Sequence, residues 1–249
     1  MMWAPFLKFL TLATLLSQVL ATCLGVTRDL FDNKGAAIPN DQTSLMSYSS
    51  VLVLDTPAKV EGASDGNLIW LAKTGYDEMV KAYKIIETKK LKGVSAPSAM
   101  VVLAPGGTNT IFLGSSLRNI GGDKNGFYGE GTVGKYLKRC LDDKQEHKAD
   151  GKCGEFNTLQ EFFDRNGHTE PLPPKSRIVA WVKTAQNEGV TPPCWTDKTE
   201  RSGCRELLAD VGEGNIKAIE GGAPIEPTGW KYVSSNGRNT RHGGSGSSS

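Results

Sequence analysis

Five cysteines constrain the fold of this 249-residue chain more than any other feature, because each must either close a disulfide or act as a thiol. They are Cys23, Cys140, Cys153, Cys194 and Cys204. The last two bracket nine mostly polar residues, with a proline pair before them and an amphipathic run after them. Two arrangements are open: disulfides that pair Cys194 with Cys204 and Cys140 with Cys153, or a site in which several thiolates hold a metal ion.

The N-terminal residues predict export. Residues 1–21 have the pattern of a secretory signal peptide, with Lys8 before an apolar run over 9–20 and the small residue Ala21 at the cleavage point. The run is too short for a membrane-spanning helix, so we expect no membrane span after cleavage. We therefore expect a secreted, extracellular protein whose mature chain keeps all five cysteines in an oxidising compartment.

The composition is that of a soluble globular protein. Hydrophobic residues make up 38% and charged residues 22% of the chain, which is enough for one good core. The net charge of +2 is too small to imply affinity for nucleic acid or membranes by itself.

Apolar spacing and turn residues predict an α/β order of elements with a partly parallel sheet. We expect a strand at 49–56, a helix that Asp65 caps, a hairpin of strands 99–104 and 110–113, a helix over 156–166, a strand at 177–184, a helix at 204–211 and weak strands in 216–221 and 229–235. This order divides the chain into the signal peptide, an N-terminal arm of unknown role at 22–60, a domain at 61–233 and a disordered tail at 234–249.

Cys153 and Glu155 stand at the predicted start of a helix, in the sequence Cys153-Gly154-Glu155. A helix N-terminus lowers the pKa of a thiol, and the thiolate is the form that binds metal. Three thiolates can hold Zn²⁺ and leave a fourth tetrahedral position for water. Glu155 is too close to Cys153 in sequence to be a comfortable second ligand, but it is well placed to reach that water.

These motifs resemble the zinc-dependent cytidine deaminase-like superfamily, whose signature is His or Cys, one residue, Glu, and later Pro-Cys-x-x-Cys. GGTNTIFLGSSLRN is similar to that family's first hairpin, RIVAWVKT to its next strand, and CRELLADVG to its last motif helix. The resemblance covers about residues 67–219. It implies a three-layer α/β fold, in which a mixed five-stranded sheet has helices on both faces.

The resemblance also implies an activity. Cys153, Cys194 and Cys204 would ligate Zn²⁺, and Glu155 would carry protons during hydrolytic deamination at C4 of a cytosine-type base or C6 of adenine. The cytosine-type base is the favoured substrate. The remaining two cysteines, Cys23 and Cys140, could then pair.

Two departures from the family pattern refine this expectation. The family places two residues between its paired cysteines, whereas nine separate Cys194 from Cys204 here. Where the free-nucleoside enzymes hold the ribose with Asn and Glu, this chain has Ser116 and Arg118, followed by Asn119. Because arginine suits a phosphate better than a neutral sugar, the substrate is expected to be a base in a nucleotide or nucleic acid.

Trp195, in the loop between the two cysteines, is a further candidate, because it could stack on the base. The alternative reading is a non-catalytic, disulfide-stapled secreted binding or effector protein without zinc. Export also allows the deaminase itself to act outside the producing cell, as an effector or toxin.

Overall fold

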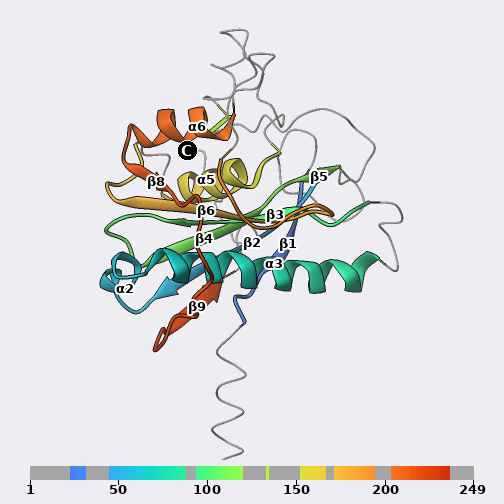
Figure 1. Ribbon diagram of the computed structural model, residues 1–249, viewed down its shortest axis with the longest axis horizontal. Coiled ribbons are helices and arrows are strands. Elements are labelled where there is room, and N and C mark those ends of the chain that lie inside the picture. The colour runs from blue at the N-terminus through green and yellow to red at the C-terminus, as the bar shows by residue number, and fades with distance from the viewer. Residues whose placement is uncertain are drawn as a thin grey trace, which may run out of the picture.

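The computed structural model describes residues 23–31, 45–87, 94–119, 133–134, 152–166, 171–193 and 203–235 (Figure 1). The expected signal peptide lies outside the described residues, as do Cys140, Cys194, Trp195 and most of the expected tail.

A single mixed sheet organises the described chain. Its nine strands are β1 (Thr27–Phe31), β2 (Leu45–Leu54), β3 (Ala99–Ala104), β4 (Thr110–Ser115), β5 (Arg118–Asn119), β6 (Ser176–Lys183), β7 (Glu188–Thr191), β8 (Ile216–Ala218) and β9 (Tyr232–Ser235). The main order is β1-β2-β4-β3-β6-β7, while β5 and β9 pair with β2 and β8 pairs with β6. Every described pairing is antiparallel except that of β6 with β8, which is parallel.

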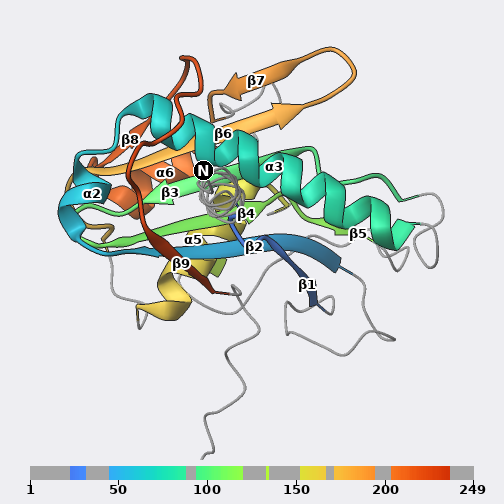
Figure 2. The same cartoon turned by 90° about the horizontal axis from the view of Figure 1, so that it is seen from below.

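Helices pack against this sheet from two sides (Figures 1 and 2). The described helices are α2 (Pro57–Glu61), α3 (Asp65–Glu87), α5 (Gly154–Arg165) and α6 (Cys204–Gly212). Along β3, Met100 and Val102 belong to the core cluster under α3, whereas Val101 and Leu103 belong to the cluster under α5 and α6. This alternation is the period of two that a strand buried on both faces imposes. In the described part of the chain, no helix is both long and apolar enough to span a bilayer.

The expected α/β class with a partly parallel sheet is confirmed, but the sheet has nine strands rather than five. Within the expected arm at 22–60, the described residues 23–31 and 45–60 belong to the folded domain, because β2 lies between β1 and β4 inside the sheet. The boundary expected at residue 61 falls at the end of α2. β2 is buried on both faces for nearly its whole length, and its serines interrupt the apolar pattern that would have marked its full extent.

The first described residues are attached to α3. Leu24 is fully buried, and its backbone N–H donates to Glu78 Oε1 at 2.6 Å. The N–H of Val26 donates to the other oxygen of the same carboxylate at 3.3 Å. The hydroxyl of Ser50 donates to the carbonyl of Leu24. These contacts place the segment before β1 within the folded domain.

Glycines allow α5 to approach the sheet closely. A Cβ on Gly114 of β4 would lie 2.5 Å from Thr158 Oγ1 and 3.1 Å from the Thr158 backbone. A Cβ on Gly154, at the start of α5, would lie 2.6 Å from Val101 Cγ2 and 3.3 Å from the carbonyl oxygen of Gly114. The start of α5 therefore rests directly on the end of β4. On the opposite face Gly75 does the same for α3, where a Cβ would lie 2.8 Å from Leu113 Cδ2.

We predict that Gly114→Ala lowers the free energy of unfolding by roughly 1–3 kcal/mol, because the added methyl group overpacks the junction of β4 with α5. Gly221→Ala is the matched control, since a Cβ there meets nothing within 4 Å. That control should change stability by less than about 0.5 kcal/mol. Urea denaturation measures both variants, and equal stabilities would contradict the close approach.

Candidate metal centre and its pocket

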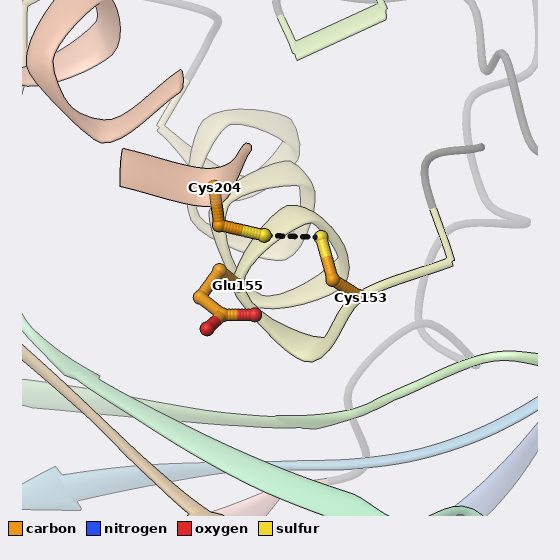
Figure 3. A group of neighbouring side chains, drawn as sticks. All are labelled: Cys153, Glu155 and Cys204. Atoms are coloured by element: carbon orange, nitrogen blue, oxygen red, sulfur yellow. Dashed lines mark hydrogen bonds between the residues drawn. The ribbon is translucent and has the colours of Figure 1, made fainter. Parts of the chain in front are cut away.

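Two helix N-termini converge at Cys153 and Cys204. Cys153 is the N-cap residue of α5, and Cys204 is the first residue of α6. The thiol of Cys204 donates to the sulfur of Cys153 over 2.9 Å, although the two residues are 51 positions apart in the chain. Figure 3 shows the two sulfur atoms facing each other. Both thiols therefore lie where helix dipoles and backbone N–H groups favour negative charge.

Glu155 completes a compact donor group. It lies in the first turn of α5, and its carboxylate and the two sulfurs all lie within 4.8 Å of one another (Figure 3). Glu155 is 9% exposed and Cys204 is 1% exposed, so most of this group is shielded from bulk water. It is the one cluster of three or more metal-ligating side chains found in the described residues.

Backbone contacts hold the start of α5 against the end of β4. The N–H of Leu117 donates to the carbonyl of Lys152 at 2.8 Å. Asn157 Nδ2 donates to the carbonyl of Ser115 at 3.1 Å, and Thr158 Oγ1 donates to the carbonyl of Gly114 at 3.4 Å. These bonds position the residues on either side of Cys153.

The start of α6 has its own cap. The backbone N–H of Gly203, the N-cap residue, donates to Glu206 Oε2 at 2.9 Å. This bond satisfies a backbone donor at the helix start in the manner of the second half of a capping box. It places Cys204 at the beginning of a regular helix, with its side chain toward α5.

A pocket of about 400 Å³ opens beside the donor group. Its lining comes from β3, β5, β6, β7, the starts of α5 and α6 and residues next to these elements: Ser98, Ala99, Ser116, Leu117, Arg118, Lys152, Cys153, Gly154, Glu155, Ala180, Val182, Thr191, Pro192 and Cys204. The volume lies within the range of small-molecule sites. The pocket is therefore lined by Cys153, Glu155 and Cys204 of the donor group. It is also lined by Ser116 and Arg118, two of the expected substrate-binding residues.

The expected substrate-binding residues differ in their placement. Ser116 and Arg118 line the pocket, whereas Asn119 does not; it pairs with Leu45 in the β5–β2 ladder. Ser116 Oγ accepts from the Ser98 N–H at 3.2 Å. The chain reaches the pocket again at Thr191 and Pro192, and the described segment ends at Pro193, directly before Cys194 and Trp195.

Lys152 is a pocket residue that the sequence analysis missed. Its position immediately before Cys153 was the available signal, because a side chain next to a ligand is expected to lie near the same site. Nothing in the sequence indicated that the Lys152 carbonyl bonds to the N–H of Leu117, which brings this lysine close to Arg118 in the pocket wall.

The donor group fits zinc in its chemistry. Thiolates select zinc and other soft or borderline cations over the hard cations Mg²⁺ and Ca²⁺. Two sulfurs bound to one tetrahedral Zn²⁺ at about 2.3 Å are separated by about 3.8 Å. Cys153 and Cys204 would have to move apart by roughly 1 Å from their 2.9 Å separation, which is within reach of side-chain rotation. The described residues are therefore compatible with a zinc ion.

Comparison with protein-family models, with curated proteins and with solved structures finds no match to this chain. Any function must therefore be inferred from its own side chains and their arrangement.

We predict that reduced, metal-free protein takes up about one Zn²⁺ per chain and that zinc at 100 times its Kd raises the free energy of unfolding by about 2.7 kcal/mol. Cys204→Ser should lose both effects, because metal binding is coupled to folding. Cys23→Ser is the matched control, since Cys23 is exposed and is not among the residues that line the pocket. Elemental analysis and thermal unfolding are the measurements, and full zinc content in Cys204→Ser would contradict the site.

Proposed function

We propose that this chain is an exported, zinc-dependent hydrolytic deaminase that acts on a nucleobase, of the cytosine type, in a nucleotide or nucleic acid. The observation that carries the proposal is the group formed by Cys153, Glu155 and Cys204. Two thiols from separate helix starts lie within 4.8 Å of a buried carboxylate, beside a pocket large enough for a base and its sugar.

The arrangement of elements supports the same proposal. Apart from the short strands β5 and β7, the described chain runs from α3 through the β3–β4 hairpin to α5, β6, α6 and β8. This succession is the one that the deaminase-like superfamily resemblance implies. The donor residues stand at the starts of α5 and α6, where the Cys-Gly-Glu and Cys-Arg-Glu motifs place them. Strands β1, β2 and β9 then extend the three-layer core on the β4 side.

Cys153 and Cys204 would hold the zinc together with Cys194. Cys194 follows the buried Pro193 directly, and the preceding Thr191 and Pro192 line the pocket. A longer loop between Cys194 and Cys204 is compatible with this ligand set, because only the ends of the loop need to reach the metal. When bound, zinc supplies Lewis acidity, which lowers the pKa of a coordinated water and makes a nucleophile available near neutral pH.

Glu155 would carry the protons. Its carboxylate accepts a proton from the attacking water and delivers it to the ring nitrogen next to the reacting carbon. A second transfer through the same carboxylate protonates the amine, which leaves as ammonia while the carbon–oxygen bond becomes a carbonyl. Water is consumed and one ammonia is released, so no oxidant or other cosubstrate is required. The low exposure of Glu155 keeps these protons from exchanging with bulk solvent during the reaction.

We predict that Glu155→Gln lowers the rate of ammonia release from the cytosine-type substrate by at least about 10³-fold while zinc content stays unchanged, because only the proton carrier is removed. Glu226→Gln, at an exposed glutamate outside the pocket, is the matched control and should retain wild-type turnover. Substrate is supplied as cytidine nucleotides and single-stranded nucleic acid, and the product is detected as a base one mass unit heavier.

Two results would contradict this role of Glu155. Normal turnover by the Glu155→Gln variant would exclude it as the proton carrier. Loss of zinc from that variant would make Glu155 a ligand instead, as its distance to both sulfurs allows.

One observation favours the alternative of a stapled, non-catalytic secreted protein. The 2.9 Å between the sulfurs of Cys153 and Cys204 is short enough that a small shift would bring them to disulfide distance. Oxidation in an extracellular compartment would then block metal binding. We expect protein purified without reductant to carry both thiols reduced and metal-bound. Intact mass after alkylation tests this, because a Cys153–Cys204 disulfide in the zinc-free native protein would support the alternative.

A further inference from the structure

Arg118 presents a guanidinium to the same pocket as the donor group. It lies in β5, immediately after the end of β4, and lines the pocket together with Ser116 and Leu117. Its Nε donates to the carbonyl of Ala96 at 3.1 Å. This bond fixes the guanidinium at its inner edge, and within the described residues the two terminal NH₂ groups form no further hydrogen bond.

Arg118 also differs from other arginines of the described chain in its charge balance. Arg165, Arg177 and Arg205 each form an ion pair with a carboxylate. The described residues place no such partner within ion-pair distance of Arg118. Burial lowers the pKa of its guanidinium, and only the weaker influence of the phenols of Tyr76 and Tyr83 opposes that shift.

A partly buried cation without a counter-charge is unfavourable, because desolvation is not repaid by Coulomb attraction. Such a group is well suited to binding an anionic ligand, which supplies the missing charge. The arginine fork matches the oxygens of phosphate in a bidentate geometry, and its Nε is already occupied by the protein.

Lys152 adds a second cation to the pocket wall. Its backbone carbonyl bonds to the N–H of Leu117, the residue that precedes Arg118, so the two cationic residues enter the pocket from adjoining backbone segments. Glu155, the acidic residue of the pocket lining, belongs to the donor group. The pocket therefore carries cationic side chains as well as the thiol and carboxylate group.

We propose that Arg118, with Lys152, forms a phosphate subsite, so that the ligand of this pocket is a phosphorylated nucleotide unit and not a neutral base or nucleoside. The identification of the base rests on the proposed function, whereas the phosphate subsite rests on Arg118 and its surroundings. A 5′-monophosphate and a backbone phosphate of single-stranded nucleic acid present the same chemistry to this arginine.

The test is binding, without turnover, of uridine, uridine 5′-monophosphate and a single-stranded oligouridylate to zinc-loaded protein, measured by calorimetry. We expect the wild type to bind at least one phosphorylated ligand roughly 10- to 100-fold more tightly than uridine, as charge-assisted hydrogen bonds to one phosphate allow. Arg118→Gln should abolish this preference. Arg118→Lys should recover only part of it, because the charge returns without the fork.

Lys81→Gln is the matched control. It removes one positive charge from an exposed position on α3, which packs on the sheet face opposite to α5. It should leave the preference for phosphate unchanged. Thermal unfolding establishes that each variant is folded, and the Arg118→Lys variant keeps the test decisive if Arg118→Gln does not fold.

The outcomes distinguish a mononucleotide from a nucleic acid strand as the source of the phosphate, and they test the phosphate subsite separately from the proposed deamination. A preference for the monophosphate that depends on Arg118 identifies a mononucleotide, whereas the same dependence for the oligouridylate alone identifies a nucleic acid strand. Equal binding of uridine and both phosphorylated ligands by the wild type overturns the phosphate subsite, even if cytidine is deaminated. Phosphate preference that depends on Arg118 in a protein that releases no ammonia overturns the proposed reaction and leaves the subsite standing.

Discussion

The close contact between α5 and β4 is the constraint on which the site depends. Gly114 and Gly154 have no side chains, so the first turn of α5 lies directly on the end of β4. Cys153 and Glu155 flank Gly154, and Ser116 and Arg118 follow Gly114 within a few residues. The close approach that these two glycines allow therefore brings the donor residues next to the cationic residues of the pocket wall.

The positions of the two thiols at helix N-termini favour their negatively charged thiolate forms. Cys153 caps α5 and Cys204 begins α6, so the positive ends of two helix dipoles point toward one small volume. A cluster of thiolates at one helix end would be opposed by mutual repulsion. Two helix starts that meet reduce that repulsion, and a cation bound between the thiols, as proposed, would reduce it further.

The sequence predicted the central elements well because their patterns are strong. The long amphipathic run after Asp65, the hairpin around Pro105 and the apolar strand at 177–184 are all close to their observed bounds. The short strands β1, β5 and β7 were missed, because a few polar residues at a sheet edge carry no periodic signal. The proximity of Cys153 and Cys204 was expected from the motif resemblance and not from residue spacing. A gap of nine residues between Cys194 and Cys204 does not determine where either thiol lies. The Arg118 guanidinium could be singled out by residue type, but only the three-dimensional structure shows that no described carboxylate forms an ion pair with it.

The attachment of Leu24 to α3 bears on the expected removal of an N-terminal leader. The expected cleavage point after Ala21 lies only three positions before a side chain that is completely buried, and both oxygens of Glu78 hold the backbone beyond it. A peptidase needs an extended, accessible stretch on either side of the bond that it cuts. If this leader is removed as expected, its removal would have to precede docking of the segment, so cleavage and completion of the tertiary structure would be ordered in time.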